Sequence, residues 1–165
     1  AATIPTVDEL AQELLLIQQS GPRKVAIIGT RNLPLTHQQL VEMLSYALVL
    51  SGNQVVTSGG ANGCNMAVIR GAQRANPDRL NIILPQTISQ QPGEVQDLLI
   101  GIKNIVEYPE RRTMTLADAS RICNHEIIDR CQQIICFLYH TSHTLLESVN
   151  YAKEHRKIVT SFYLD

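Results

Sequence analysis

Residues 24–31 read KVAIIGTR, and this stretch decides the fold. After Lys24 the four residues Val-Ala-Ile-Ile are continuously apolar, which is typical of a parallel strand that is covered on both faces. A glycine ends the apolar run, and polar residues follow it. Because such a strand needs helices on both of its sides, the surrounding sequence is expected to alternate between strands and helices.

The rest of the chain shows this alternation. A capping box at residues 6–9 opens a first helix, which a Ser-Gly-Pro at 20–22 ends, and a second capping box at 36–39 predicts the start of the next helix. Further strands are expected at residues 54–57, 80–84, 105–106, 133–138 and 157–162, and further helices at 64–75, 94–100, 115–130 and 144–155. This order predicts an α/β fold: a single Rossmann-like three-layer domain with a mainly parallel sheet and helices on both faces.

Length and composition agree with one domain. The chain has 165 residues, of which 44% are hydrophobic and 18% charged, and these values exclude disordered and collagen-like chains. We expect residues 1–23 to form an N-terminal helix packed on the domain, and residues 24–165 to form a nucleotide- or phosphate-binding domain. The longest apolar run, at 134–139, is too short to cross a bilayer, and no basic signal-peptide region precedes the first helix. A soluble, cytoplasmic protein without membrane contact is therefore expected.

The charge balance limits the ways of binding nucleic acid. Fourteen Lys and Arg face fifteen Asp and Glu, aromatic residues make up 4%, and Trp is absent. A broad phosphate-binding surface and a base-stacking platform are both disfavoured, so a nucleic acid is expected to bind in a local pocket. No C-x-x-C pair occurs among the four cysteines, and His140 and His143 have no partner at metal-ligand spacing. We therefore expect buried, unpaired cysteines, no metal and no cofactor.

Candidate ligand contacts follow three of the predicted strands. Open parallel sheets bind ligands beyond the carboxyl ends of their strands, and residues 29–31, 58–63 and 140–144 fall at such ends. The segment 58–63, SGGANG, brings free N–H groups to the start of a helix, which favours an anion; the alternative is a tight turn without a ligand. The predicted phosphate ligands are Gly29, Thr30, Arg31, Ser58, Gly59, Gly60, Ala61, Gly63, Asn65, Ser142 and Thr144.

The roles of three of these side chains have simpler alternatives. Arg31 can fork onto a phosphate or stay a solvated surface residue. The hydroxyls of Ser142 and Thr144 can contact a ligand or cap the helix that begins there. Glu147 lies one helical turn beyond Thr144, so both side chains are expected to face the same cleft.

The ordered motifs resemble those of the DNA-processing protein A family, the recombination mediators of natural transformation. Four blocks carry the likeness, in the order of that family: residues 24–31 for its "VAIVGSR", residues 55–65 for its "VVSGGARGID", residues 125–128 for its "RNRII" and residues 142–146 for its "SGSLIT". The superfamily also includes the lonely-guy phosphoribohydrolases. The resemblance runs from about residue 24 to residue 160, nearly the whole chain.

This resemblance implies a recombination-mediator-type module that binds a nucleotide or single-stranded DNA through phosphate-binding turns and acts without catalysis. It also implies a homodimer or higher homo-oligomer, to which the final strand can offer an edge, and a protein partner such as a recombinase. The chain departs from the family pattern at Asn65, which replaces an aspartate, at 124–126, where Asn-His-Glu replaces Arg-Asn-Arg, and at His143, which replaces a glycine. Because family arginines are absent, single-stranded DNA is expected to bind weakly.

Two other functions stay open. The lonely-guy pattern "GGxGTxxE" is matched at Thr144 and Glu147, and this resemblance implies a hydrolase of nucleoside monophosphates with Glu147 and Arg121 as the catalytic pair. His140, Thr141 and His143 stand where those enzymes have glycines, which argues against the hydrolase. The third possibility is an interaction or assembly protein that has kept the fold and lost the ligand, which explains the absent arginines.

Overall fold

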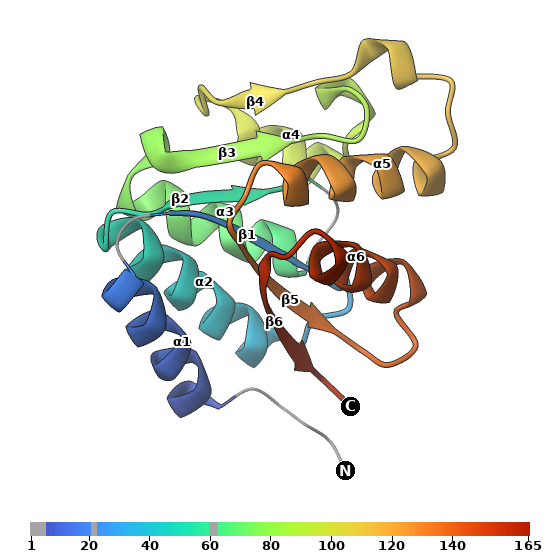
Figure 1. Ribbon diagram of the computed structural model, residues 1–165. Helices are drawn as coiled ribbons and strands as arrows, with labels where there is room; N and C mark the ends of the chain where they lie inside the picture. The colour runs from blue at the N-terminus through green and yellow to red at the C-terminus, as the bar shows by residue number, and fades with distance from the viewer. Residues whose placement is uncertain (1–5, 21–22, 60–62) are drawn as a thin grey trace.

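The computed structural model describes residues 6–20, 23–59 and 63–165 (Figure 1). In this part of the chain six strands form one sheet in the order β4-β3-β2-β1-β5-β6, and every neighbouring pair is parallel. The strands are β1 (Lys24–Gly29), β2 (Gln54–Thr57), β3 (Leu80–Ile83), β4 (Ile105–Val106), β5 (Gln133–Leu138) and β6 (Ile158–Tyr163). The predicted α/β fold with a parallel sheet is confirmed.

Helices cover both faces of this sheet (Figure 1). One face carries α1 (Val7–Ser20), α2 (Leu35–Leu50), α3 (Cys64–Ala75) and α4 (Gly93–Leu99), and the other carries α5 (Leu116–Asp129) and α6 (His143–Glu154). Within β1, Val25 and Ile27 enter the core of the first face, and Ala26 and Ile28 enter that of the second. Continuous apolar strands are therefore needed, because both faces of the central strands are dry.

Most predicted element boundaries agree with the structure to within one residue, but the second capping box is wrong. The first box is present: the Glu9 N–H donates to Thr6 Oγ1 at 3.1 Å, and the Thr6 N–H donates to Glu9 Oε2 at 3.2 Å. Helix α2, in contrast, begins at Leu35 after Pro34, and no side chain caps it. The proline fixes a backbone dihedral that is compatible with a helix start, so α2 begins before Thr36.

Three further features complete the fold. Helix α1 packs beside α2, and its buried Glu13 accepts hydrogen bonds from Gln133, the first residue of β5, and from Thr160 in β6. The four cysteines are free and buried, as predicted, and burial raises the pKa of Cys136 to about 12. No helix among the described residues is long and apolar enough to span a membrane.

The strand order reverses at β1. The chain adds β2, β3 and β4 on one side of β1 and then returns to place β5 and β6 on the other side. The connections that leave β1 and β5 therefore run in opposite directions and open a crevice at the carboxyl ends of the strands. Seen in Figure 1, β2 and β3 point toward the right of the molecule, so this crevice lies on that side.

Candidate functional site

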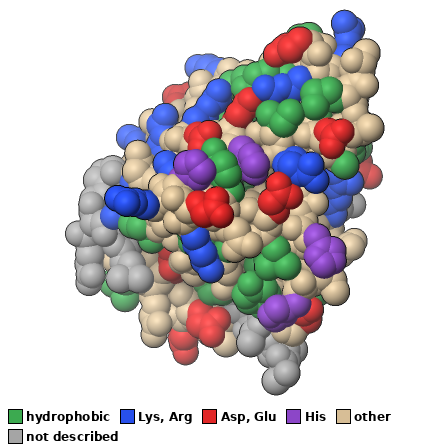
Figure 2. All heavy atoms as spheres, turned by 45° about the vertical axis from the view of Figure 1, so that its right-hand side comes forward, with side chains coloured by type: hydrophobic (Ala, Val, Ile, Leu, Met, Phe, Trp, Pro, Cys, Tyr) green, Lys and Arg blue, Asp and Glu red, His purple; other side chains and the backbone are tan. Residues whose placement is uncertain are grey.

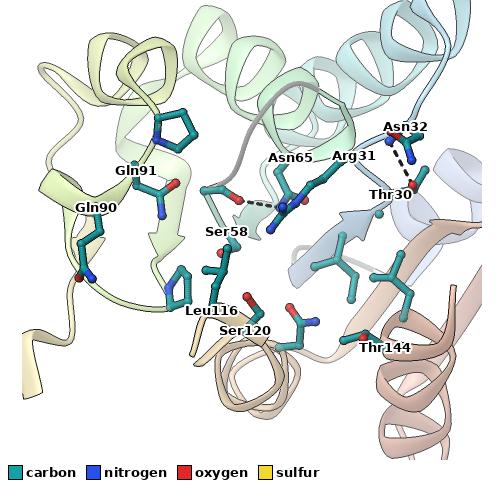
Figure 3. Close-up of a pocket in the computed structure, with 17 residues that line it drawn as sticks. Thr30, Arg31, Asn32, Ser58, Asn65, Gln90, Gln91, Leu116, Ser120 and Thr144 are labelled. Atoms are coloured by element: carbon teal, nitrogen blue, oxygen red, sulfur yellow. Dashed lines mark hydrogen bonds between the residues drawn. The ribbon is translucent and has the colours of Figure 1, made fainter. Parts of the chain in front are cut away.

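A pocket of about 360 Å³ lies at the carboxyl ends of the strands, where the strand order reverses (Figure 3). It contains seven of the predicted ligand residues: Gly29, Thr30, Arg31, Ser58, Gly59, Asn65 and Thr144. The predicted ligands Gly60 and Ala61 lie outside the described residues. The remaining two, Gly63 and Ser142, do not line the pocket and have other positions.

At the base of the pocket, the turn after β1 lies in close contact with the backbone of neighbouring segments. A Cβ atom on Gly29 would lie 2.6 Å from Cys64 Sγ and 2.8 Å from the Phe137 carbonyl oxygen, so the position has no room for a side chain. Gly63 has a φ of +130°, and a Cβ there would lie 2.5 Å from the Arg31 carbonyl oxygen. Gly63 therefore packs against the backbone of the turn after β1 and does not line the pocket.

Backbone hydrogen bonds hold this turn in place. The Thr30 N–H donates to the Phe137 carbonyl at 2.9 Å, and the Cys64 N–H donates to the Thr30 carbonyl at 3.1 Å. The Thr30 side chain is also occupied, because its Oγ1 accepts the Asn32 N–H at 3.1 Å. The turn that presents Arg31 is thus tied to both β5 and the start of α3.

Arg31 is the charged residue among the described residues that line the pocket. Its side chain is exposed, and it forms no ion pair within the described part of the chain. Figure 3 shows this side chain extending from the end of β1 toward Asn65 and the pocket. A guanidinium placed in this way is available to a phosphate, and its planar fork matches two phosphate oxygens.

The turn after β2 is braced by side chains. Asn65, which stands where the resembled family has an aspartate, donates from Nδ2 to the Gly59 carbonyl at 2.9 Å. Thr57 donates its hydroxyl to the Ile27 carbonyl at 2.7 Å and so ties β2 to β1. The Ser58 hydroxyl lies 3.5 Å from Cys123 Sγ on α5. Asn65 therefore shapes the pocket rather than remaining free for a ligand.

Sequence reasoning missed the opposite wall. It comes from the segment before α4, which includes η2 (Ile88–Gln90), and from α5. The residues that it adds are Pro85, Gln90, Gln91, Pro92, Leu116, Ser120 and Asn124. Of these only Asn124 belonged to a block that resembled a family motif, and single Gln and Ser residues in a loop carry no recognisable signal.

Gln91 is the most buried amide of this wall. It is 8% exposed, and its Oε1 has no hydrogen-bond partner among the described residues. Figure 3 shows the Gln91 side chain directed into the pocket between the segment before α4 and the turn after β2. A buried amide without a partner has a desolvation cost that a bound ligand can relieve.

Ser142 and Glu147 lie apart from the pocket. The Ser142 hydroxyl accepts the Tyr139 N–H at 3.1 Å and makes no capping bond to α6. Glu147 lies in a separate groove between α5 and α6, where its Oε1 is 3.2 Å from Arg121 Nε. The expectation that Thr144 and Glu147 face one cleft is wrong. Side chains three positions apart on an α-helix point in directions that differ by about 60°, and Glu147 is directed toward Arg121 on α5.

The three residues that replace the family's Arg-Asn-Arg lie in three different environments. Asn124 enters the pocket, His125 stacks on Tyr151 with ring centroids 3.9 Å apart, and Glu126 pairs with Arg111 Nη2 at 2.5 Å. Burial alone would raise the pKa of Glu126, but hydrogen bonds from Arg111 and Tyr108 outweigh it and lower that pKa. This ion pair ties α5, and with it the Asn124 wall, to the connection after β4.

No group of three or more His, Cys, Asp or Glu side chains in the described ranges could hold a metal ion. The fold defines an α/β protein of the Rossmann-like class, with a pocket where its strand order reverses. Within that class the chain belongs to the family described as DNA recombination-mediator protein A, which matches residues 15–157.

A solved structure and the curated proteins complete the comparison. DNA processing protein A from Helicobacter pylori, a protein studied for its single-stranded DNA binding mode, shares 23% sequence identity with this chain, with a TM-score of 0.71. The match covers 87% of this chain and 66% of that protein, so the chain spans less than two thirds of its length. No curated protein matches the chain. At this identity the structural likeness establishes the fold.

Proposed function

We propose that this chain binds single-stranded DNA in the pocket at the carboxyl ends of its strands, as a recombination-mediator-type module that acts without catalysis. The family assignment supports the recombination-mediator role. The relative from Helicobacter pylori is described as a single-stranded DNA-binding protein, which supports the choice of ligand.

The observation that carries this proposal is the chemistry of the pocket. A single arginine, Arg31, stands beside the backbone turns that follow β1 and β2, and a wall of uncharged polar side chains faces it. A volume of about 360 Å³ is near the lower limit of ligand pockets, roughly 300–1,000 Å³, so it suits a nucleotide unit rather than a longer segment. We therefore place a phosphate at Arg31 and a base against the opposite wall.

Two amides are suited to the base. The side chains of Gln91 and Asn124 form no hydrogen bond with described residues, and both line the pocket. An amide offers a donor and an acceptor side by side, which is the pattern that base edges present. Gln90 is different, because its Oε1 accepts from Thr87 and its Nε2 donates to the Arg112 carbonyl.

The position of Glu147 supports a function without catalysis. Its carboxylate lies in the α5–α6 groove and faces Arg121 and His125, at 3.2 and 3.9 Å. A hydrolase would need this carboxylate beside the ribose of a nucleotide in the pocket.

The test is a titration of the full chain with inorganic phosphate, AMP and a short oligothymidylate, followed by backbone amide chemical shifts. We expect shifts at Gly29, Thr30, Arg31, Ser58 and Gly59. Arg31→Ala should weaken binding of the oligonucleotide by about 1.5–3 kcal/mol, because it removes a charge-assisted hydrogen bond. Arg121→Ala is the matched control, since it removes the same charge outside the pocket. If none of the three ligands shifts these amides at millimolar concentration, the proposal is wrong.

For partners we propose a second copy of this chain and a recombinase. β6 pairs with β5 alone among the described strands, so its other edge is available for a homo-oligomeric contact. Light scattering on the full chain tests the first part, and a monomer at every concentration would contradict it. The recombinase is supported by the family assignment, and co-purification with added recombinase tests it.

A further inference from the structure

The amino ends of the strands carry a row of cations. Five of the six strands either open on a Lys or Arg or follow one within three residues, and β2, which begins at Gln54, is the exception. We name this set the amino-end row: Arg23, Lys24, Arg79, Lys103, Arg130 and Lys157. Because adjacent strands lie about 4.8 Å apart and the row extends from β4 to β6, it is roughly 24 Å long.

Two adjoining hollows run along this row. The larger, of about 680 Å³, is lined by Arg23, Lys24 and Arg79 together with amide side chains. The smaller, of about 340 Å³, is lined by Lys24, Lys103 and Arg130, by two asparagines and by apolar residues of β2, β3 and β4. No carboxylate among the described residues lines either hollow. Figure 2 shows several Lys and Arg side chains along its left edge, the side on which the strands begin.

Three of the six cations are held by neutral groups. Arg79 donates to the Gly52 carbonyl at 2.8 Å, Arg23 donates to Gln133 Oε1 at 3.3 Å, and Arg130 donates to the Tyr108 hydroxyl at 3.4 Å. Hydrogen bonds of this kind position a guanidinium without neutralising it, and each leaves further N–H donors unused.

The neighbouring acids offset only part of this charge. Asp78 lies 3.8 Å from Lys103, and both side chains are highly exposed, so the pair is weak. Asp129 accepts the Tyr151 hydroxyl, and Glu13 accepts from Gln133 and Thr160. Burial raises the pKa of Cys131 to about 12, while Lys24, Lys157 and Arg130 act to lower it. These three members of the row therefore lie near enough to Cys131 to act on it electrostatically.

Helix dipoles are the alternative explanation for cations at this end. The carboxyl ends of α2, α3, α4, α5 and α6 lie on this side, because each of these helices connects two parallel strands and ends before the next strand begins. At about half a negative charge per helix end, the five helices offset roughly two to three positive charges. Asp78, Asp129 and Glu13 add negative charge nearby, but none of them lines either hollow, so the charged groups that a ligand meets in the hollows are cations.

We propose that the amino-end row binds the phosphodiester backbone of a nucleic acid, at a site separate from the pocket at the carboxyl ends. A row of cations with intervening amides suits a linear polyanion, since each phosphate meets a cation and each amide can contact a sugar or phosphate oxygen. This site is independent of the pocket, because the two lie at opposite ends of the same strands.

The test measures binding of the full chain to a labelled single-stranded 12-mer and to a 12-base-pair duplex over a series of salt concentrations. The row variant is Lys24→Gln with Arg79→Gln. The matched control is Arg70→Gln with Arg121→Gln, which removes the same charge outside both sites. If single strands occupy the row, its variant should reduce the slope of log K against log[salt] by about 1.4 for the 12-mer; a duplex occupant would reduce the slope for the duplex by about 1.8.

The outcomes separate the two sites. The row variant should weaken binding severalfold in the native chain and also in the Arg31→Ala background. If Arg31→Ala removes binding and the row variant equals the control, the row is refuted and the pocket stands. If the row variant alone weakens binding, the pocket is refuted and the row stands.

Equal competition by poly-glutamate of the same charge would also overturn the assignment to nucleic acid. Urea unfolding of every variant checks that the fold is intact.

Discussion

The two ends of the parallel sheet are built in different ways. At the carboxyl ends, backbone segments approach so closely that Gly29 and Gly63 have no room for a side chain, and the pocket that results has one arginine among its described lining residues. At the amino ends, two hollows have five cations and no carboxylate among their described lining residues. The net charge of −1 averages over both ends and therefore hides the difference.

The two ends of the sheet should therefore differ in the amino-acid substitutions that they tolerate. The carboxyl end depends on backbone geometry, which few residue types can adopt, whereas the amino end depends on side chains such as Lys24 and Arg79, which are exposed. Substitution at the first end should therefore cost stability, and substitution at the second should change ligand binding while leaving the fold intact.

The largest effect is expected for Gly63→Ala. The positive φ of Gly63 is strained for any side chain, and the new Cβ would lie 2.5 Å from the Arg31 carbonyl oxygen. Backbone strain and overpacking each cost roughly 1–3 kcal/mol, so we expect the free energy of unfolding to fall by about 3 kcal/mol or more. Urea denaturation of the native chain and the variant measures this loss.

Two controls sharpen the comparison. Gly93→Ala places a Cβ where nothing lies within 4 Å, at the start of α4, so it should be neutral or stabilising by up to about 1 kcal/mol. Lys24→Gln at the amino end should change the free energy of unfolding by less than about 0.5 kcal/mol. If Lys24→Gln were as costly as Gly63→Ala, the contrast between the two ends would be lost.

An intermediate effect is expected at the opposite wall of the pocket, which α5 helps to form. Glu126→Gln removes the ion pair with Arg111 that ties α5 to the connection after β4, and should cost about 1.5 kcal/mol at neutral pH. Because the pKa of Glu126 is lowered in the folded chain, the stabilisation is fully present above the ordinary value of about 4.3. It is lost as the pH falls through the lowered pKa.

The measurement is the free energy of unfolding from pH 7 to pH 3 for the native chain and for Glu126→Gln. The difference between the two should stay constant above about pH 4.3 and shrink below it. A difference that does not depend on pH would show that Glu126 contributes through packing rather than through its charge.

The fold was predictable because it depends on local patterns. The apolar run after Lys24 and the alternation of strands and helices give the parallel sheet, and the glycine turns give its carboxyl edge. The start of α2 was missed because Pro34 competes with a plausible capping box, and a pattern of polar residues does not show which start has the lower energy.

The candidate site was predictable only in part. The turns after β1 and β2 are continuous in the sequence, so the close positions of Arg31 and Ser58 followed from the strand order. Gln91 and Asn124 come from segments far apart in the chain, and only tertiary packing brings them together. The amino-end row was missed for a related reason, since its cations are dispersed in sequence and become neighbours only through the strand order.

The smallest effect is expected for Glu147→Gln, which tests whether the functional part of the carboxyl end extends over α5 and α6. The Glu147 and Arg121 side chains are 45% and 51% exposed, so their ion pair should contribute less than about 0.5 kcal/mol to stability. Because Glu147 does not line the pocket, the variant should bind oligonucleotides as the native chain does.

Neither the native chain nor Glu147→Gln should release free base from a panel of nucleoside monophosphates. Glu154→Gln is the control from the same groove. Turnover by the native chain that survives in Glu154→Gln and disappears in Glu147→Gln would place catalysis in the α5–α6 groove and contradict the assignment of function to the pocket.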